Sequence, residues 1–409
     1  MRVRGRSDAN PETVPVKPLD GLLVLDFSRV LAGPMATMIL AELGARVIKV
    51  EQPGSGDESR GWEPRVGEES GYFFAVNRSK ESITLNLRKP AARALARRLA
   101  LKADILIENF PTGTMAKFGL DHAALEADNP RLVYVSNTGF GQTGPYAQRK
   151  GYDTIFQAMG GIMGLTGEID GGPVKAGLPV GDLSAGLWIV IAALTGIAGR
   201  ATGGSGCHVD LSMLDVQVSL LTIAAARYFA LGEVPPRSGT EHPGRVPSAA
   251  FRCRDGKWLQ ITGSDQHWPP LCRVLKLDAL LADEALAKNG ARVRRRTEVM
   301  AALTGAIAHW DRPALLAALD AADVPAGPIN ALDEVLADPQ VAARGMVGRF
   351  EHPHAGAFPA LALPVKFTGY DDPAIGRPPL LGEHTASVLA RELGLADAEI
   401  AALQAEEVL

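Results

Sequence analysis

The chain has 409 residues, with 42 Lys or Arg against 46 Asp or Glu, and so carries a formal net charge of -4. This balance argues against an overall basic surface for nucleic acid or anionic lipid. The cysteines, Cys207, Cys253 and Cys272, are odd in number and widely separated, which gives no zinc-ligand spacing and suits a reducing compartment. The length allows two or more domains.

The first 17 residues are basic, then polar and proline-bearing, and they lack the apolar segment of a secretory signal. We expect a flexible tail there. After it, short apolar runs alternate with helical patterns that begin near Pro34 and Pro90. The expected strands span residues 22–27, 46–51, 82–87, 104–108 and 132–136. Such alternation predicts a mostly parallel, doubly wound sheet.

The loops after these strands are the expected ligand site, because open α/β sheets bind ligands at the carboxyl ends of their strands. The loop SRVLAGP after the first strand lacks the G-x-G-x-x-G fingerprint, which argues against a nicotinamide enzyme. Its place before a helix still suits a phosphate. Arg29, Lys80, Arg88 and Lys117 lie on or near such loops, as phosphate contacts or as ordinary surface charges.

A change in composition near Gly232 indicates a second, smaller unit. EVPPRSGTEHPGRVPS is a proline-rich linker, and FRCRDGKWLQITG then predicts a hairpin with its turn at Asp255-Gly256. Amphipathic, alanine-rich helices follow. The expected division is a tail over residues 1–17, a large domain over 18–225, a small domain with linkers over 226–329, and the C-terminal part of the large domain over 330–409.

Asp182 stands in the motif GDLSAG at the start of the most apolar run, LSAGLWIVIAALTGIAG. This run is shorter than the roughly 20 residues of a membrane span and contains glycines, so we expect a buried core helix. An aspartate at this place is expected to cap the helix through its carboxylate. The positive end of the helix dipole would keep the carboxylate ionised, and only the ionised form attacks a carbonyl.

Other catalytic signatures are absent from the sequence. It contains no G-x-x-x-x-G-K-[ST], H-E-x-x-H, C-x-x-C or G-x-S-x-G pattern, so phosphate-loop, zinc and serine-hydrolase mechanisms lack their defining residues. His208, beside Cys207 at the start of an expected strand, is interpreted as a structural histidine.

Five segments carry a resemblance to a known family. They are PLDGLLVLDFSRVLAGPMATMILAELGARVIKVEQPGSGDESRGW, ADILIENF, SNTGFGQTGPYAQRKGYD, LPVGDLSAG and PPLLGEHT. In this order and spacing they closely resemble the class III coenzyme A transferases, which include formyl-CoA, carnitine-CoA and succinyl-CoA dependent enzymes. The match runs from about Pro18 to the C-terminus. The resemblance implies a Rossmann-like, doubly wound parallel sheet built from both ends of the chain, a smaller central α+β domain, and an interlocked homodimer.

The resemblance also implies a reaction. Asp182 would attack an acyl-CoA thioester to give an acyl-aspartyl anhydride, and the released CoA thiolate would convert it to an aspartyl-CoA thioester before a carboxylic acid accepts the CoA. CoA would be a substrate, and no tightly bound cofactor and no metal are expected. The expected partners are acyl-CoA, a carboxylic acid and a second copy of the chain, with no nucleic acid and no membrane. The expected location is cytoplasmic.

The resemblance further assigns a set of residues to the CoA nucleotide and two to the neighbourhood of the substrate. The CoA set is Arg29, Val30, Leu31, Ala32, Gln52, Asn77, Arg78, Ser79, Lys80, Asn109, Phe110, Pro111, Lys117, Thr138, Gly139, Phe140 and Gly141. The substrate pair is Trp62 and Tyr152. Lys80 and Lys117 would meet phosphates, and Phe110 would pack near the adenine.

Two positions bear on the choice among related activities. Family members that use oxalate carry Gln where this chain has Leu31, which argues against oxalate as the acceptor. Racemases of the superfamily carry His where this chain has Tyr152, which favours transfer, with an acyl-CoA racemase or epimerase and a non-catalytic CoA-binding protein as alternatives. Arg227, Arg237 and Arg245 suit a second carboxylate of the substrate or are surface charges.

Overall fold

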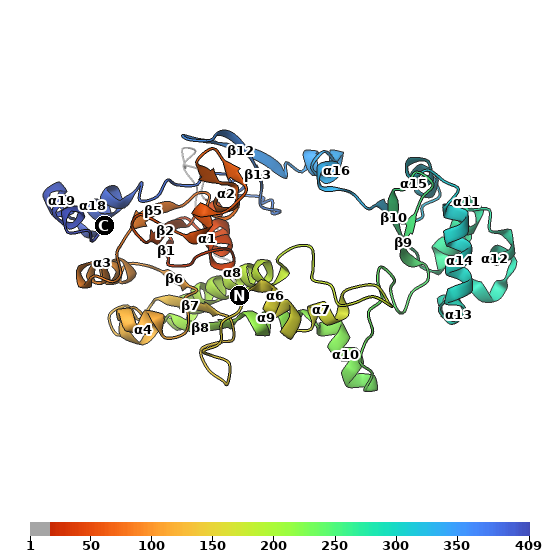
Figure 1. Ribbon diagram of the computed structural model, residues 1–409, viewed down its shortest axis with the longest axis horizontal. Helices are drawn as coiled ribbons and strands as arrows, with labels where there is room; N and C mark the ends of the chain where they lie inside the picture. Colours follow the sequence, from red (N-terminus) through yellow and green to blue (C-terminus); the bar gives the residue numbers. More distant parts are fainter. Residues whose placement is uncertain (1–16) are drawn as a thin grey trace, which may run out of the picture. The chain divides into compact units, whose positions relative to one another are not determined.

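A computed structural model describes residues 17–409 (Figure 1), and the expected tail lies outside this range except for Lys17. The chain divides into two compact units. The first comprises the described residues up to Ile162, Ala176–Ile223 and Ala343–Leu409, and the second comprises Met163–Lys175 and Ala224–Ala342. The sequence suggests breaks at 225/226 and 329/330, whereas the units change at 223/224 and 342/343.

The first unit is built on a parallel sheet of six strands. The strands are β1 (Leu23–Asp26), β2 (Arg46–Glu51), β5 (Glu81–Thr84), β6 (Ile105–Glu108), β7 (Val133–Thr138) and β8 (Cys207–Ser212). Their spatial order, β5-β2-β1-β6-β7-β8, is the 3-2-1-4-5-6 order of the dinucleotide-binding Rossmann fold when the strands are counted along the chain. The doubly wound parallel sheet is therefore confirmed.

Alternating strand residues face two separate cores. Val24 packs with α1 (Ala32–Glu42), α8 (Val180–Gly203) and α9 (Met213–Leu220), whereas its neighbour Leu25 packs into the opposite core. Helices α3 (Pro90–Ala100) and α18 (Thr385–Leu393) form part of that second core. The C-terminal segment thus adds helices to the unit but no strand to this sheet, which corrects the expectation that both ends build the sheet itself.

The remaining elements of the first unit surround these layers. They are η1 (Glu58–Gly61), β3 (Arg65–Val66), β4 (Glu69–Ser70), α2 (Gly71–Val76), α4 (Thr114–Phe118), α5 (His122–Leu125), α6 (Asp153–Met159), β12 (Val347–His352), β13 (Gly356–Leu361) and α19 (Asp397–Ala405). Strands β12 and β13 form an antiparallel hairpin beside α2, whose Phe73 and Phe74 pack against Phe350.

The second unit has its own antiparallel sheet, in the order β11-β10-β9, and its own apolar core. The expected hairpin is confirmed, with β9 paired to β10 and Gly256 at φ +78° in the turn, a conformation that favours glycine. Its elements are β9 (Ser248–Arg252), β10 (Trp258–Thr262), η2 (Asp265–His267), α11 (Trp268–Val274), α12 (Asp278–Ala282), η3 (Glu284–Ala287), α13 (Asn289–Arg294), α14 (Arg296–Ile307), α15 (Arg312–Ala321), β11 (Ala326–Pro328) and α16 (Leu332–Leu336). Helices α7 (Ile162–Leu165), α10 (Thr222–Leu231) and α17 (Pro339–Ala343) cross the unit boundaries.

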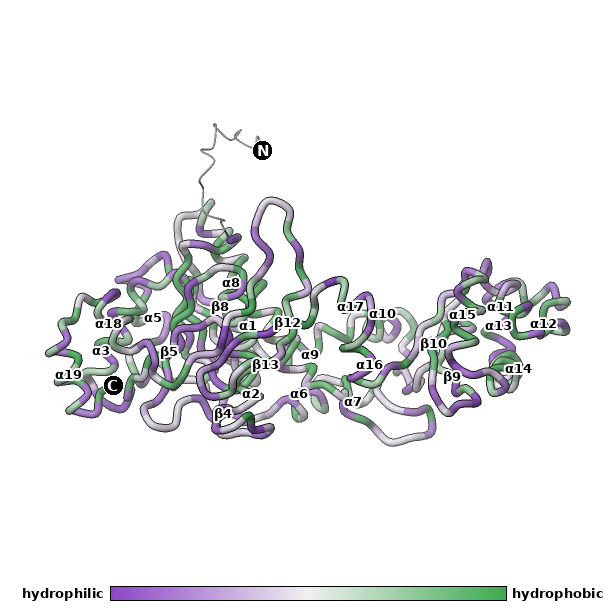
Figure 2. The backbone as a smooth tube through the Cα atoms, turned by 90° about the horizontal axis from the view of Figure 1, so that it is seen from above, coloured by the Kyte–Doolittle hydropathy of each residue, from purple (hydrophilic) through white to green (hydrophobic). Residues whose placement is uncertain are grey.

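Helix α8 is longer than the apolar run that predicts it and is hydrophobic along most of its length (Figure 2). Its 24 residues are long and apolar enough to cross a membrane, although a core helix of a soluble protein meets the same criterion. Ala185, Ile189 and Ala193 are buried against the sheet and α1, while Leu187 and Trp188 are exposed. The helix therefore presents one packed face and one open apolar face.

Candidate active site

Asp182 is the third residue of α8 and does not cap the helix with its own side chain. The helix begins at Val180, and the capping acceptor comes from another element: Asp153, the first residue of α6. Its Oδ1 accepts hydrogen bonds from the backbone N–H groups of Gly181 at 2.8 Å and Asp182 at 3.2 Å. The expectation that Asp182 caps α8 is therefore wrong, because Asp153 fills that role.

Glycine is required at position 181 for this contact. A Cβ atom there would lie 2.6 Å from Asp153 Oδ1, closer than van der Waals contact allows. The other Asp153 oxygen accepts a hydrogen bond of 2.6 Å from Gln157 Nε2, one turn later on α6. Asp153 is thus held on both oxygens, and it fixes the backbone that carries Asp182.

The Asp182 carboxyl is a weak acid in this setting. Burial, and secondly the negative charge of Asp153, raise its pKa to about 7. The expectation that the helix dipole keeps the Asp182 carboxylate ionised is therefore corrected, because desolvation and the charge of Asp153 raise its pKa to about 7. Near neutral pH a substantial fraction remains ionised, and that fraction is more basic than an ordinary aspartate.

Two aromatic residues belong to the same neighbourhood. The pKa of the Tyr72 hydroxyl is raised to about 12, first by burial and then by the charges of Asp182, Asp57 and Asp153. The ring of Trp62 meets the Tyr72 ring edge to face, with centroids 5.0 Å apart. Trp62 belongs to the expected substrate pair, whereas Tyr72 and Asp153 are not among the expected site residues. Asp153 follows the expected residue Tyr152 directly in the sequence, and Tyr72 has no such neighbour.

Tyr152, the other residue expected near the substrate, lies at an exposed position. It is the N-cap residue of α6 and is 81% exposed. Its neighbour Asp153, rather than Tyr152, makes the contact to the backbone of Asp182.

A pocket of about 240 Å³ opens at the carboxyl ends of β1, β2 and β5. It gathers Arg29, Gln52 and Phe110 from the expected CoA set. The loops that carry them are tied together, because Arg29 N–H donates to Asn109 Oδ1 and Asn109 Nδ2 donates to the Arg29 carbonyl, both at 2.8 Å. The Arg29 guanidinium lies 4.9 Å from the centre of the Phe110 ring.

The same pocket contains residues that the sequence prediction did not assign to CoA. Leu85, Asn86, Leu87 and Arg88 line it because β5 ends at Thr84, so these residues form a loop rather than the end of a strand. Arg88 was noted only as a basic residue near a loop. It is exposed, and it provides a cationic group at the pocket.

Asn77, Arg78 and Lys80 are buried in the protein instead, and Ser79 is partly buried. The Lys80 ammonium donates to Asp26 Oδ2, the Pro34 carbonyl and Asn77 Oδ1, at 2.8 to 3.1 Å, and is fully buried. Arg78 forms a buried ion pair with Glu42. All three Lys80 donors are therefore used internally in this structure, which argues against the expected contact of Lys80 with a phosphate.

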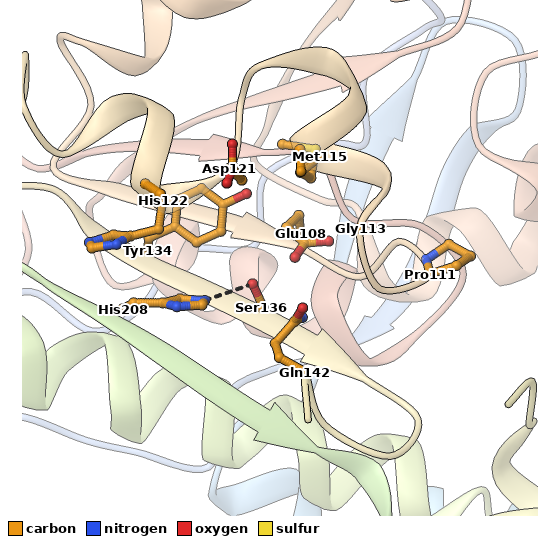
Figure 3. A pocket seen from close by; sticks show the side chains of 12 residues that line it. Glu108, Pro111, Gly113, Met115, Asp121, His122, Tyr134, Ser136, Gln142 and His208 are labelled. Carbon is orange, nitrogen blue, oxygen red and sulfur yellow. Dashed lines mark hydrogen bonds between the residues drawn. The ribbon is translucent and has the colours of Figure 1, made fainter. Parts of the chain in front are cut away.

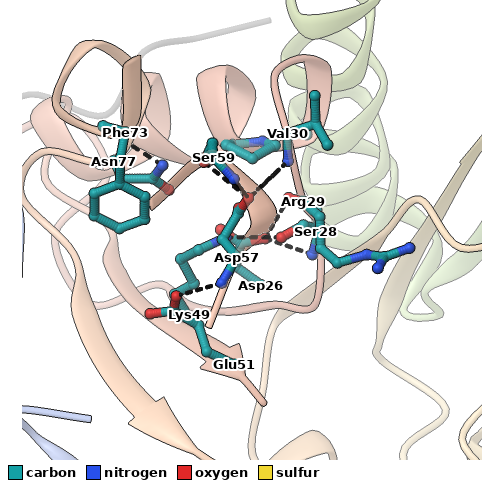
Figure 4. A network of polar contacts seen from close by, with 12 residues as sticks. Asp26, Ser28, Arg29, Val30, Lys49, Glu51, Asp57, Ser59, Phe73 and Asn77 are labelled. Carbon is teal, nitrogen blue, oxygen red and sulfur yellow. Dashed lines mark hydrogen bonds and ion pairs between the residues drawn. The ribbon is translucent and has the colours of Figure 1, made fainter. Parts of the chain in front are cut away.

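A buried polar network holds the loop before α1 (Figure 4). Asp57 pairs with Lys49 at 2.9 Å and accepts a hydrogen bond from the N–H of Val30, whose φ is +72°. A left-handed backbone at a β-branched residue is strained and persists only where its surroundings enforce it. The Lys49 ammonium also donates to the Ser28 carbonyl, so the network sets the course of residues 28–30.

The other expected CoA residues do not line this pocket. Leu31 and Ala32 are buried at the start of α1, and Ser79 accepts a hydrogen bond from Gly376 N–H. Thr138 ends β7, and Phe140 packs against Phe156. Gly139 and Gly141 follow β7, Lys117 is exposed on α4, and Pro111 lines a second pocket.

Within residues 17–409, no group of three or more His, Cys, Asp or Glu is arranged to hold a metal ion.

Comparison with known proteins identifies the family of this chain. The model of CoA-transferase family III matches residues 19–385. The chain is 41% identical to succinate–glutarate CoA-transferase of Agrobacterium fabrum, over 91% of this chain and 95% of the relative, and 40% identical to acetyl-CoA:oxalate CoA-transferase of Acetobacter aceti, over 88% and 93%. A CaiB/BaiF family protein from Brucella suis superposes with a TM-score of 0.83 at 43% identity, over 92% of this chain and 99% of that one. The chain belongs to CoA-transferase family III and is an enzyme of that family.

Proposed function

We propose that this enzyme moves CoA from an acyl-CoA thioester to a free carboxylic acid, with Asp182 as the covalent nucleophile. The observation that carries the proposal is the setting of its carboxyl: a pKa of about 7, with the backbone fixed by Asp153. A partly desolvated carboxylate of raised basicity attacks a thioester carbonyl more readily than a solvated one. Its helix is also fixed, which limits the reorganisation needed for attack.

The proposed reaction conserves the thioester through four acyl transfers. The ionised Asp182 oxygen attacks the thioester carbon, the C–S bond breaks, and CoA leaves as thiolate from an acyl-aspartyl anhydride. The thiolate attacks the aspartyl carbonyl, which gives an aspartyl-CoA thioester and releases the donor acid as carboxylate. The acceptor carboxylate displaces the thiolate to form a second anhydride, and the thiolate then takes the new acyl group and frees Asp182. No net proton is taken up.

The CoA nucleotide is proposed to occupy the pocket lined by Arg29, Gln52, Asn86, Arg88 and Phe110. Phe110 and the Arg29 guanidinium offer an aromatic and a planar cationic surface to the adenine, and Arg88 offers a charge to a phosphate. Of the other expected contacts, Lys117 is exposed on α4 with its ammonium open to a phosphate. Trp62 and Tyr72 are proposed to border the acyl group near Asp182.

The acids are proposed to be dicarboxylic. The relative named for succinate and glutarate supports this, since both acids carry two carboxyl groups, whereas the relative named for acetyl-CoA and oxalate pairs a monocarboxylic acyl group with a dicarboxylic acid. No basic side chain within residues 17–409 is among the groups that shift the pKa of Asp182, so a cation for the second carboxyl of the substrate has to come from another part of the chain. Of the basic candidates in the linker and second unit, Arg227 pairs with Glu233, while Arg245 is exposed. A panel of mono- and dicarboxylic acceptors with one acyl-CoA donor tests this: comparable rates with acetate and glutarate contradict it.

A homodimer with interlocked chains is proposed as the working form. Exposed apolar side chains on α8 and α10 support it, since large apolar groups are usually covered in an assembly. They include Leu187, Trp188, Ile191, Ile223 and Phe229. A cytoplasmic location, no tightly bound cofactor, and no nucleic-acid or membrane partner complete the proposal. Sedimentation of the purified protein tests the dimer, and a monomer at micromolar concentration contradicts it.

Two experiments separate transfer from the alternatives. A racemase exchanges the α-proton of a chiral 2-methylacyl-CoA in deuterated water without any acceptor acid, whereas the proposed transferase leaves it in place. A binding protein without catalysis binds CoA yet gives no transfer with any donor.

Asp182→Asn is expected to abolish transfer and keep CoA binding, while Asp215→Asn, an exposed carboxyl in the first turn of α9, is expected to change neither. Retained transfer in Asp182→Asn contradicts the nucleophile.

A further inference from the structure

A second cavity, of about 210 Å³, lies over one face of β6, β7 and β8 (Figure 3). Glu108, Ser136 and His208 project into it from these three strands, and Asp121 and His122 reach it from the start of α5. It is distinct from the pocket proposed for CoA. The two are lined by consecutive residues, because Phe110 lines the CoA pocket and Pro111 lines this one.

Glu108 is the unusual group of this cavity. Its side chain is almost fully buried, accepts a hydrogen bond from Phe110 N–H at 2.9 Å, and also bonds to Ser136. Burial raises its pKa to about 7, and no cation offsets that effect. Buried carboxylates are normally paired with a positive group, so this one lacks its usual counter-charge.

The cavity supplies a second carboxyl and, from the described residues, no Lys or Arg side chain. Asp121 lines it and makes no capping bond to α5. Among the residues of the described chain that form its walls, none is Lys or Arg. The two histidines stack on each other with ring centres 5.1 Å apart, and His208 Nε2 is 3.0 Å from Ser136 Oγ. The Tyr134 hydroxyl donates to the Leu120 carbonyl.

The two carboxyl groups of the cavity, Glu108 and Asp121, indicate the charge of the ligand that it would bind. An anion would meet two carboxyls without a compensating cation, and no metal-binding group of side chains is present within residues 17–409. A positively charged ligand would supply the counter-charge that Glu108 lacks. We propose that this cavity binds a small organic cation, of the primary ammonium or guanidinium class, between Glu108 and Asp121. This inference does not rest on the proposed CoA-transfer function.

Calorimetric titration of the purified full-length protein tests the proposal. The probes are n-propylammonium and n-propylguanidinium chloride, with propionamide as the neutral analogue and propionate as the anion. Saturable binding is expected for at least one cation and for neither control. Because the cation binds the ionised form of Glu108, its affinity is expected to rise about tenfold from pH 6 to pH 8, with proton release.

Variants separate the site from general surface charge. Glu108→Gln keeps an acceptor for Phe110 N–H, and it is expected to lower cation affinity at pH 8 at least tenfold and to reduce the rise in affinity between pH 6 and pH 8, while Asp121, His122 and His208 still line the cavity. Asp121→Asn, at a partly exposed position, is expected to weaken binding in a chain that folds normally. Asp371→Asn, an exposed carboxyl outside the cavity, is expected to change nothing. No saturable heat with either cation, equal binding of propionamide, or unchanged affinity in both cavity variants overturns the proposal.

Discussion

The Asp153 carboxylate accepts a hydrogen bond from the backbone of Asp182, and its negative charge disfavours ionisation of the Asp182 side chain. The Asp153 Oδ1 atom accepts the N–H of Asp182 at 3.2 Å, while the negative charge of the same carboxylate helps to raise the pKa of Asp182 to about 7. One residue therefore fixes the position of the proposed nucleophile and increases its basicity. The two effects can be separated, because an amide retains one acceptor oxygen for the N–H groups of Gly181 and Asp182, loses the charge, and gives up only the contact with Gln157 Nε2.

Asp153→Asn is accordingly expected to shift the pH dependence of the enzyme. Removal of the neighbouring charge lowers the pKa of Asp182, so the acidic limb of kcat/KM moves to lower pH. The profile between pH 5 and 9 measures this. Asp153→Ala loses the acceptor as well, and a loss of roughly 1 kcal/mol of stability is expected from the missing cap. An acidic limb that stays in place in Asp153→Asn contradicts the assignment of that limb to Asp182.

Gly181→Ala is expected to disturb the same contact sterically. The added Cβ would lie 2.6 Å from Asp153 Oδ1, so either the N-terminus of α8 or Asp153 must move, and kcat is expected to fall. Gly199→Ala is the matched control on the same helix, since its Cβ meets nothing within 4 Å. The control is expected to keep full activity and to gain up to about 1 kcal/mol in urea unfolding. Equal activities of the two variants would argue against a role for the Asp153 contact.

Asp182→Asn is expected to stabilise the protein at alkaline pH. A carboxyl whose pKa is raised on folding costs stability once the unfolded chain ionises it, so the cost grows from about pH 4 to about pH 7 and then levels off. The amide carries no such cost. Thermal melts should therefore show a higher Tm for the variant at pH 8 and convergence with the unaltered protein near pH 4. A lower Tm of the variant at pH 8 contradicts the raised pKa.

Lys80 and Arg88 are expected to behave oppositely when removed. Lys80→Met leaves the buried carboxylate of Asp26 short of a partner and is expected to cost about 3–5 kcal/mol in urea unfolding. Arg88→Ala is expected to keep stability within about 0.5 kcal/mol and to weaken CoA binding roughly tenfold or more. Arg98→Ala, an exposed arginine on α3 outside the pocket, serves as the control. A stable Lys80→Met variant with weakened CoA binding would reverse the two assignments.

The layout of the sheet was predictable because its strands are short apolar runs separated by helical patterns, and strand β2 was predicted to its last residue. The end of β5 was not, since Leu85 and Leu87 continue its apolar pattern while the strand stops at Thr84. The pocket residues Asn86 and Arg88 were therefore expected at or just beyond the end of a strand rather than in a loop, while the assignment of Asn77 to Lys80 came from the family resemblance. Strand pairing, which sequence periodicity does not report, decides where a strand ends.

The sequence singles out Asp182 as the candidate nucleophile but does not indicate what surrounds it. A glycine-flanked aspartate before an apolar helix is compatible with capping or with catalysis, and local rules favour the cap. The competing acceptor, Asp153, lies 29 residues earlier on another helix, so only the tertiary fold reveals it. The same holds for Lys80, whose buried partner Asp26 is 54 residues away.

The central claim is that Asp182 carries the reacting group. Incubation of the enzyme with an acyl-CoA donor, rapid acid quench and mass spectrometry of the peptide containing Asp182 measures this directly. The account predicts an acyl or CoA adduct on that residue, lost in Asp182→Asn and retained in Asp215→Asn. Full transfer activity without an adduct on Asp182, or with one on another residue, would contradict it.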